Sequence, residues 1–315
     1  MQRVIAVTLN PAIDLTGNID ELHPGELNLV NDFSRHCAGK GINVARILAD
    51  LGADVTVTGF LGNNNQMGFE SLFEQKGLKD QFLRVDGRTR VNIKLAESNT
   101  RTTEINFPGF HVDTAIQQRL FDQLRHQAGP DSLFILSGSL PQGVEPWFYA
   151  ELIRALRAKG ATVYFDSSSA ALTEGVKAGP HLIKPNLKEL SHWCGKEITT
   201  LEQALPFAQQ LHQNGVAQVV ISASCQGAIT VSGQGVFRST PPKVNVVSEV
   251  GAGDTLVAGL AWAAIKGWDI AQGLRFATAL ASWTVSDHGV HVPSMEALDY
   301  VLNNTQVESL KAMRS

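Results

Sequence analysis

The sequence predicts an α/β fold with a mostly parallel sheet, and three features of the chain predict it. Short apolar runs rich in β-branched residues recur along the 315 residues, amphipathic stretches separate them, and several of the runs end in small polar residues. Buried strands that alternate with helices form βαβ units, whose strands pair in parallel. Ligands of such sheets bind beyond the carboxyl ends of the strands, so we expect the functional site there.

Six apolar runs are the predicted strands, in chain order "VIAVTLN" at 4–10, "VTVTGFLG" at 55–62, "LFILSGS" at 133–139, "TVYFDSS" at 162–168, "HLIKPN" at 181–186 and "QVVISAS" at 218–224. Amphipathic stretches at 146–160 and 201–215 are predicted helices. In the first of them, apolar side chains fall on one face at helical spacing. The polar residues at the predicted strand ends are Ser137, Ser139, Asp166, Ser167, Asn186, Ser222 and Ser224.

Two stretches, at about 12–36 and 88–107, do not fit this alternation and predict a small β element appended to the α/β body. The second reads as a hairpin with a turn near Ser98-Asn99. Side chains alternate along a strand, so Arg90, Asn92 and Lys94 are expected on one face of the hairpin.

Composition excludes several classes of function. The formal net charge is −4 and the pI is about 6.1, which argues against nucleic acid and against a polybasic membrane anchor as partners. The N-terminal stretch does not read as a signal peptide, and no apolar run is long enough for a transmembrane helix. Three scattered cysteines fit a reduced compartment, so we expect a cytoplasmic protein. The histidines and cysteines show no spacing typical of structural zinc.

The stretch "VGAGDT" predicts an anion site at the start of a buried helix. Glycines at 251 and 253 let backbone N–H groups approach a ligand, and the first turn of a helix leaves such groups unpaired. Asp254 follows them. From this segment alone, Asp254 is also consistent with an ordinary helix N-cap.

Two further segments are weak signals when each is taken alone. In "CAGKGINVA", glycines at 39 and 41 open another predicted helix, with Asn43 in its first turn. In "KPNLKEL", Lys184 ends a strand, and Asn186 and Glu189 are spaced so that one helical turn brings both to a hydrated cation such as Mg²⁺. A solvated helix surface explains Glu189 equally well.

Taken together, the motifs "TLNPAID", "GKGINVA", "RTRVN", "SGSLP", "FDSS", "KPNLKEL" and "VGAGDT" occur in an order and spacing that resembles the ribokinase-like sugar kinases of the phosphofructokinase-B group. The resemblance spans nearly the whole chain. It implies one domain over 1–315, a ribokinase-like doubly wound three-layer α/β sandwich, with the two irregular stretches as a small β lid. It also implies a homodimer formed through the lid.

The resemblance also implies roles for individual residues on the sugar side of the site. Asp254 would be the general base, and Gly251, Ala252 and Gly253 would form the anion hole for the transferred phosphoryl group. Asp14, Gly39 and Asn43 match residues that hold sugar hydroxyls, and the neighbouring Lys40 is placed in the substrate site but is not diagnostic. Arg90 with Lys94 would hold a phosphate on the substrate, and Ser139 would line the same pocket.

The implied cofactors are ATP and Mg²⁺. Lys184, Asn186, Glu189, Ser222 and Gly227 match positions on the nucleotide side, with Glu189 and Asn186 serving Mg²⁺ through water. The sequence departs from the family at Ser224, which stands where the family has glycine. A side chain there would crowd the nucleotide loop if the backbone requires a positive φ.

The implied reaction is ATP-dependent phosphorylation of fructose 1-phosphate to fructose 1,6-bisphosphate. A kinase for tagatose 6-phosphate or fructose 6-phosphate is the alternative within the family, and a non-catalytic sugar-phosphate sensor is the alternative outside enzymes. An intact Asp254 argues against the sensor, because binding needs no base. A dinucleotide-dependent oxidoreductase is disfavoured because no GxGxxG follows the first strand.

Overall fold

One large sheet runs through the body of the protein. The computed structural model describes residues 2–98, 101–286 and 290–310. The strands of the large sheet are β1 (Arg3–Thr8), β4 (Val55–Gly62), β5 (Lys79–Asp80), β6 (Leu83–Val85), β9 (Ser132–Ser137), β10 (Thr162–Asp166), β11 (Leu182–Ile183), β12 (Gln218–Ser222), β13 (Ala228–Ser232), β14 (Gly235–Thr240) and β15 (Gln306–Leu310). Their order is β15-β14-β13-β12-β11-β10-β9-β1-β4-β5, and β6 pairs with β4.

The six predicted strands are all present, and the pairings from β12 through β11, β10, β9, β1 and β4 to β5 are all parallel. The predicted α/β fold is therefore confirmed. The sequence analysis missed the antiparallel edge formed by β13, β14 and β15. No α-helix separates these strands from β12: a 3-10 turn at Ser224–Gln226 joins β12 to β13, and a short turn at 233–234 joins β13 to β14.

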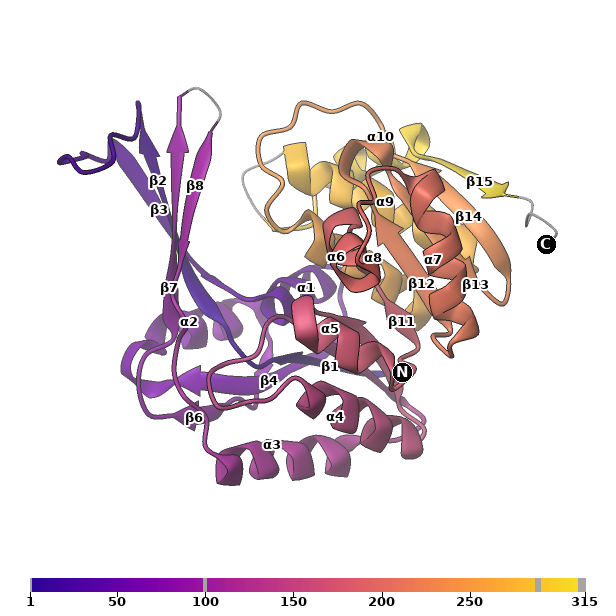
Figure 1. Cartoon of the computed structure of the whole chain (residues 1–315), viewed down its shortest axis with the longest axis horizontal. Coiled ribbons are helices and arrows are strands. Elements are labelled where there is room, and N and C mark those ends of the chain that lie inside the picture. Colours follow the sequence, from indigo (N-terminus) through magenta and orange to yellow (C-terminus); the bar gives the residue numbers. More distant parts are fainter. Residues whose placement is uncertain (1, 99–100, 287–289, 311–315) are drawn as a thin grey trace.

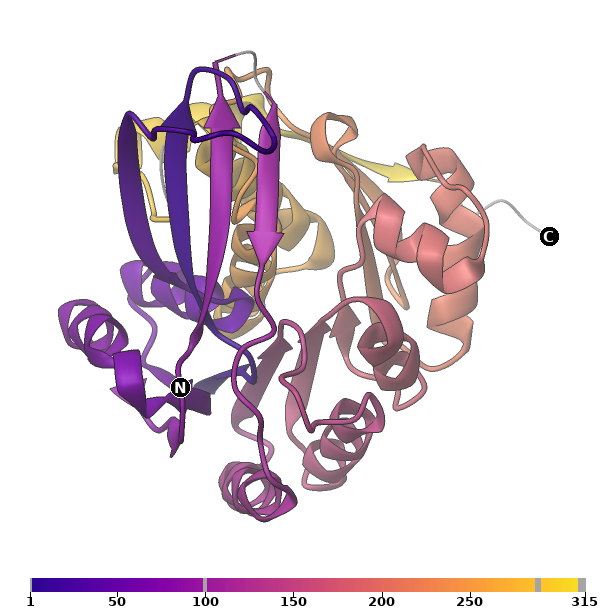
Figure 2. The same ribbon diagram turned by 60° about the vertical axis from the view of Figure 1, so that its left-hand side comes forward.

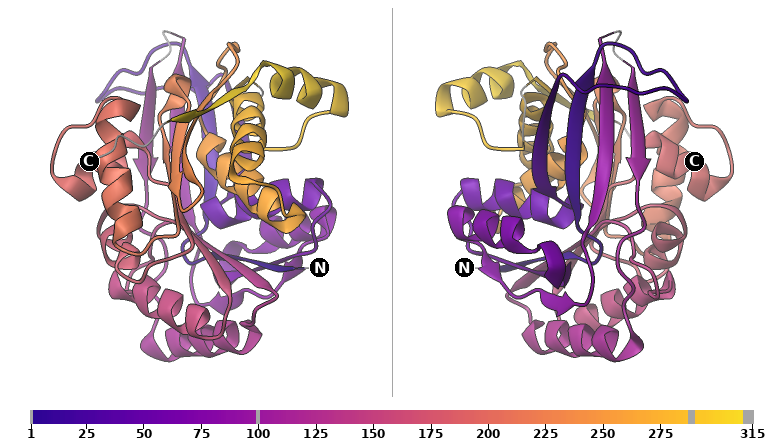
Figure 3. Two further views of the ribbon diagram at one scale, coloured as in Figure 1. Left: turned by 90° about the vertical axis from the view of Figure 1, so that its right-hand side faces the viewer. Right: turned by 90° about the vertical axis from the view of Figure 1, so that its left-hand side faces the viewer.

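Helices cover both faces of this sheet, which gives three layers (Figures 1 and 3). Neighbouring residues of a strand point to opposite faces, so Ile5 and Val7 enter one hydrophobic core while Val4 and Ala6 enter the other. The helices of the first core are α3 (Thr114–Gln127), α4 (Trp147–Ala158), α5 (Ser169–Val176), α6 (Leu187–Cys194) and α7 (Leu201–Gln213). Those of the second core are α1 (Lys40–Asp50), α2 (Met67–Lys76), α8 (Ala252–Lys266), α9 (Ile270–Ser286) and α10 (Met295–Asn304).

The apolar character of α8 follows from its position. It packs against α1 on one side and α9 on the other, and every residue from Asp254 to Ala261 is buried. A helix enclosed on all sides needs apolar residues around its whole circumference rather than along one stripe. The start of α8 is therefore packed between two other helices, α1 and α9.

A second, four-stranded sheet stands off the body (Figures 1 and 2). Its strands are β2 (Ala12–Ile19), β3 (Asp32–Ala38), β7 (Arg90–Glu97) and β8 (Thr102–Asn106), in the order β3-β2-β7-β8. β7 and β8 form the predicted hairpin, although Asn99 of the predicted turn lies outside the described residues. The parallel pairing of β2 with β7 places Asp14 opposite Asn92, a contact between segments far apart in the sequence.

Among the residues that the structure describes, no helix combines the length and the apolar character needed to cross a membrane.

Candidate active site

The first turn of α8 is partly exposed at residues 251–253 and buried from Asp254 onward. Its N-cap is Gly251, which has φ +83, and a Cβ at this position would collide with Val290. Only glycine meets both conditions at low cost. Asp254 is the third residue of the helix, so the interpretation of Asp254 as the N-cap is wrong. Ala252 and Gly253 complete the turn. Its N–H groups lack acceptors within the helix, although Ala252 N donates to Glu249 O outside it at 3.4 Å.

The side chain of Asp254 is held by the neighbouring helix. Asp254 is 7% exposed, and its Oδ2 accepts a hydrogen bond of 2.7 Å from Asn43 Nδ2 in the first turn of α1. Gly39 is the N-cap of α1, so the predicted glycine segment also opens a helix, as expected. The packing of α1 on α8 therefore brings two helix starts, separated by more than 200 residues in the chain, to one point.

Burial raises the pKa of Asp254 to about 6. Desolvation is the largest cause, because a buried carboxylate loses its hydration. Asp166 also raises this pKa, whereas the positive charges of Lys40 and Lys184 and the hydrogen bond from Asn43 lower it. A carboxyl group with this pKa is ionised at neutral pH and is a stronger base than an exposed aspartate.

Two lysines face Asp254 and share a carboxylate, Asp166, that the sequence analysis named among the polar strand ends but to which it gave no role. Asp166, at the end of β10, is 2% exposed. Its Oδ2 lies 3.3 Å from Lys40 Nζ, and its Oδ1 lies 3.5 Å from Lys184 Nζ. Burial lowers the pKa of Lys40, but the charges of Asp166, Asp254 and Glu189 outweigh burial and raise it. The signal for Asp166 was its place at a strand end in "FDSS".

Lys184 lies beside the helix start. A Cβ on Gly253 would lie 3.3 Å from Lys184 Nζ, so the absence of a side chain there leaves room for the ammonium group. Lys184 is 3% exposed. The N–H groups of the turn and the lysine together supply positive charge at one small, largely dehydrated location.

Asn186 and Glu189 form a capping box at the start of α6. Asn186 Oδ1 accepts from Glu189 N at 2.8 Å, and Glu189 Oε2 accepts from Asn186 N at 3.0 Å. This gives both residues a local structural role. The other carboxylate oxygen, Glu189 Oε1, lies 3.8 Å from Lys40 Nζ. Glu189 therefore faces the lysine cluster, and its side chain is only 15% exposed.

A second polar group lies on one face of the small sheet. Asp14 on β2 accepts a hydrogen bond of 3.0 Å from Asn92 Nδ2 and lies 3.3 Å from Lys94 Nζ. The predicted face of β7 is confirmed by this contact, since Asn92 and Lys94 reach the same carboxylate.

Arg90, on the same strand, reaches the body of the protein. Its Nη2 donates to Asn10 O at 3.3 Å and to Ser139 Oγ at 3.4 Å, and its Nε is buried without a hydrogen-bond partner in the described structure. Asn10 Nδ2 donates to Ser139 Oγ at 3.3 Å. Asn10 was missed as a site residue, although it lies in "TLNPAID" beside Asp14. These three residues form what we call the Arg90 cluster.

Asp254, Asn43, Lys40, Lys184 and Asp166 form what we call the Asp254 cluster, and Gly138 connects it with the Arg90 cluster. Gly138 precedes Ser139, and its N–H donates to the carbonyl of Asp166 at 2.9 Å. A Cβ built on Gly138 would lie 3.9 Å from the Cβ of Lys40. A small molecule between the two clusters would therefore meet a guanidinium group at one end and a buried carboxylate at the other.

The predicted nucleotide loop follows β12. Ser222 ends that strand and pairs with Asn186 through a β-bridge. Ser224 has φ +46, so the backbone at this position does adopt the positive φ that disfavours a side chain, and Ser224 Oγ donates to Glu249 Oε1 at 2.8 Å. Gly227 has φ +88, and a Cβ there would collide with Ser239 O.

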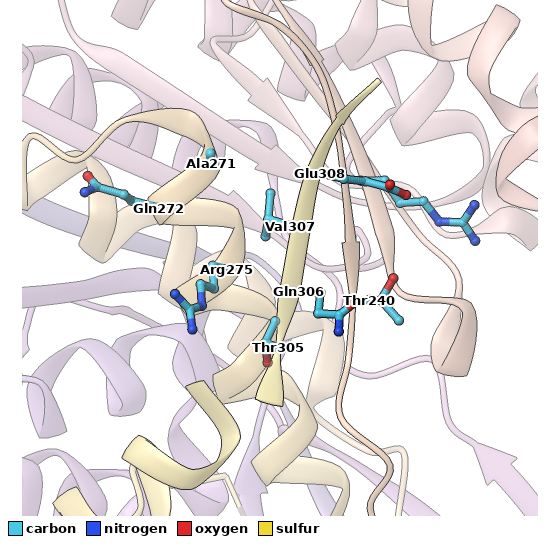
Figure 4. A pocket seen from close by; sticks show the side chains of 9 residues that line it. Thr240, Ala271, Gln272, Arg275, Thr305, Gln306, Val307 and Glu308 are labelled. Atoms are coloured by element: carbon cyan, nitrogen blue, oxygen red, sulfur yellow. The ribbon is translucent and has the colours of Figure 1, made fainter. Parts of the chain in front are cut away.

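A cavity of about 550 Å³ lies elsewhere, between α9 and the strands β14 and β15 (Figure 4). Its lining includes Arg238, Arg275 and Glu308 and contains none of the predicted site residues. Arg275 is bound to the carbonyl of Leu302, and Arg238 pairs with Glu202. Both guanidinium groups are therefore paired within the protein, and the lining of this cavity does not indicate a ligand or a reaction.

The chemistry of the Arg90 and Asp254 clusters indicates which class of enzyme this protein belongs to. An amide-lined helix start with a lysine neutralises a phosphoryl group, and a buried carboxylate beside it accepts a proton, which together suit a phosphotransferase. The family model for pfkB family carbohydrate kinases matches residues 2–297, and the chain belongs to this family.

Similar proteins agree with this assignment. The chain is 45% identical to the 1-phosphofructokinase of Vibrio cholerae over 309 residues, which is 98% of each chain. It is 42% identical to the 1-phosphofructokinase of Haemophilus influenzae over 313 residues, covering 99% of this chain and 100% of the relative. A solved structure from Thermotoga maritima, described as a possible 1-phosphofructokinase, matches with a TM-score of 0.87 and 28% identity, over 98% of this chain and 100% of that chain.

Proposed function

We propose that this protein transfers the γ-phosphoryl group of ATP to fructose 1-phosphate and so produces fructose 1,6-bisphosphate. The observation that carries the proposal is the pairing of the Arg90 cluster with the Asp254 cluster across Gly138. A substrate that bears a phosphate for the Arg90 cluster and a free hydroxyl group for Asp254 matches both clusters. The names of the relatives, with 42% and 45% identity over nearly the whole chain, support fructose 1-phosphate as that substrate.

In this proposal Asp254 would take the proton of the sugar hydroxyl as the hydroxyl oxygen attacks the γ-phosphorus. The bond from that phosphorus to the β–γ bridging oxygen would break, and ADP would leave. The N–H groups of residues 251–253 and the ammonium group of Lys184 neutralise charge on the phosphoryl group as it moves. Phosphoryl transfer needs mostly positioning and charge neutralisation, and the enclosed start of α8 provides a fixed geometry for both. Arg90 and Ser139 hold the phosphate of the sugar, and Asp14 and Asn43 orient its hydroxyl groups.

The carboxylates present fit Mg²⁺, which ATP-dependent kinases use to neutralise phosphate charge. Mg²⁺ is usually held by one or two carboxylates together with waters and substrate phosphates. Asp166 Oδ1 is buried and makes no hydrogen bond in the described structure. The capping box uses Glu189 Oε2, so Glu189 Oε1 takes no part in it. These two oxygens would face the ion, while Asn186 keeps Glu189 oriented. Among the described residues no group of three or more His, Cys, Asp or Glu is placed to hold a metal ion.

A coupled assay over a panel of sugars tests the proposal. We expect fructose 1-phosphate to be phosphorylated with the highest kcat/KM, ahead of fructose 6-phosphate and tagatose 6-phosphate. Free fructose should be a poor substrate, because it leaves the Arg90 guanidinium without a partner. Better turnover of tagatose 6-phosphate or fructose 6-phosphate would overturn the substrate assignment and leave the kinase assignment intact. Absence of turnover of any sugar would favour a sensor instead.

We also propose that the small sheet is a lid and that two lids pair in a homodimer. The strand register puts Asp14, Asn92 and Lys94 on one face. The opposite face carries Leu15, Ile93, Leu95, Ile105 and Phe33. Phe33 is 67% exposed and Ile105 is 46% exposed, and Leu29 in the β2–β3 connection is 74% exposed. A contiguous exposed apolar face of this kind is typical of an interface.

The substitution Phe33→Lys should shift the protein from dimer to monomer in analytical ultracentrifugation, because a buried lysine at the lid interface lacks a partner. Its activity should fall with the loss of the dimer, since the lid would lose its support. Tyr300→Lys is the matched control, because Tyr300 on α10 is 63% exposed and lies outside the lid. A wild-type protein that sediments as a monomer would contradict the proposal.

We place this activity in the cytoplasm, where ATP is available to an enzyme that consumes it. The three cysteines, Cys37, Cys194 and Cys225, are free thiols, as a reducing compartment would keep them.

A further inference from the structure

Lys40 occupies an unusual position among the charged groups of the site. Its ammonium group lies between a carboxylate at the end of β10, 3.3 Å from Asp166 Oδ2, and a carboxylate in the first turn of α6, 3.8 Å from Glu189 Oε1. Lys184 touches only one of them, on the other oxygen of Asp166. Of these two lysines, Lys40 is therefore the one that bridges both carboxylates. It contacts the Glu189 oxygen that would face a divalent cation and, on Asp166, the oxygen next to the one that would face it.

The surroundings make this bridge electrostatically significant. Asp166 is 2% exposed and the Glu189 side chain is 15% exposed, so water screens the bridge only partly. The Lys40 side chain is 34% exposed, whereas that of Lys184 is 4% exposed. Lys40 also has a flexible four-carbon stem that can carry its charge to another position. Lys184 is enclosed and has little freedom to move.

We propose that Lys40 is a built-in competitor of the divalent cation: in the free enzyme its ammonium group neutralises Asp166 and Glu189 and keeps the cation from binding before the nucleotide. This inference rests on the proposed function, because it assigns a role within the same site. Nucleotide phosphates attract Lys40 away from the two carboxylates. The carboxylates then become available to the cation that accompanies the phosphates.

Direct binding of Mn²⁺ to the free enzyme, without nucleotide or sugar, tests the inference. We expect Lys40→Met to bind Mn²⁺ up to about fivefold more tightly than the wild type, by titration calorimetry or by the paramagnetic signal of unbound Mn²⁺, because a partly exposed ion pair is worth less than one decade in affinity. Lys40→Arg retains the positive charge and should bind Mn²⁺ as weakly as the wild type. Lys40→Gln is a second neutral variant, for use if the methionine variant fails to fold.

Two controls separate competition at the site from a general change in charge. Lys188→Met removes an exposed lysine adjacent to Glu189 in the chain, with which no ion pair is recorded among the described residues, and should leave Mn²⁺ affinity unchanged. The double variant Lys40→Met/Glu189→Gln should lose the gain, because it removes one of the two carboxylates that Lys40 bridges.

The inference is overturned if neither neutral variant at position 40 binds Mn²⁺ more tightly than the wild type, or if Lys188→Met produces the same gain. Its failure is distinguishable from failure of the proposed function, since the wild type would still phosphorylate fructose 1-phosphate in the coupled assay. An inactive wild type would contradict the proposed function and would leave the Mn²⁺ measurement to decide the role of Lys40.

Discussion

Asp254→Asn should lower turnover by a factor of about 10²–10⁴, the usual contribution of a positioned general base. The amide has nearly the size of the carboxyl group and retains an oxygen that can accept from Asn43 Nδ2, so the start of α8 should keep its shape. The amide cannot take a proton from the sugar hydroxyl. Steady-state kinetics with saturating ATP and sugar measure the effect, and the KM values should change far less than kcat.

The pH dependence of the wild type gives an independent check of the same residue. The base must be ionised to work, and burial raises the pKa of Asp254 to about 6. Activity should therefore fall as the pH drops through about 6, well above the range in which an exposed aspartate would titrate. The small residual activity of Asp254→Asn should lack this limb of the profile.

Thermal unfolding of Asp254→Asn shows whether a loss of activity comes from the missing base or from a damaged fold. The folded-state pKa of Asp254 is raised above its unfolded value, so the ionised form that dominates at pH 7 to 8 costs the folded state free energy. A neutral asparagine avoids this cost. Asp254→Asn should thus unfold at a higher temperature than the wild type at pH 8, with the difference shrinking as the pH falls below 6. Near wild-type turnover in a variant of this stability would exclude Asp254 as the base.

Arg90→Ala should raise the KM for the phosphosugar by about 10- to 100-fold and change the KM for ATP little. Loss of a hydrogen bond to a charged group costs about 1.5–3 kcal/mol, which corresponds to this range of affinity. Arg90 contacts Ser139 and Asn10 rather than the residues around the start of α8, so we expect the nucleotide side to be unaffected. Initial-rate measurements with each substrate varied in turn provide the comparison.

Arg88→Ala is the matched control, because Arg88 is an exposed arginine two residues away in the same segment. It should leave both KM values near those of the wild type. If Arg90→Ala raised the two KM values equally, Arg90 would be a structural residue of the lid hinge rather than a phosphate ligand.

Much of the fold could be predicted from the sequence because its signals are local. The six buried strands are short β-branched runs, and their alternation with amphipathic helices indicates a parallel sheet. The antiparallel edge formed by β13, β14 and β15 was not predicted. In particular, β15 follows α10 and pairs with β14, a strand far away in the sequence. Ser224 was predicted to be a problem position, and its φ of +46 confirms that the backbone there is unusual.

The site was predicted less completely than the fold, and Asp166, Asn10 and Lys40 show why. Asp166 and Asn10 are single polar residues at the ends of predicted buried strands, where many polar residues have no function. Asp166 was therefore named as a polar strand end without a role, and Asn10 was not singled out. Lys40 was placed with the sugar, whereas the structure gives it contacts with Asp166 and Glu189. These partners lie 126 and 149 positions along the chain, and sequence spacing does not encode such distances.

The sequence by itself determined which segments become strands and helices, which helix begins with glycines, and which family the motifs resemble, because backbone preferences and hydrophobic periodicity act over a few residues. Only the tertiary structure decided which charges meet. The parallel order of β10, β11 and β12 and the packing of α1 on α8 bring Asn43, Asp166, Lys184 and Asp254 together. The pKa of Asp254 follows from that assembly, since burial and neighbouring charges are properties of the packed chain and of no segment alone.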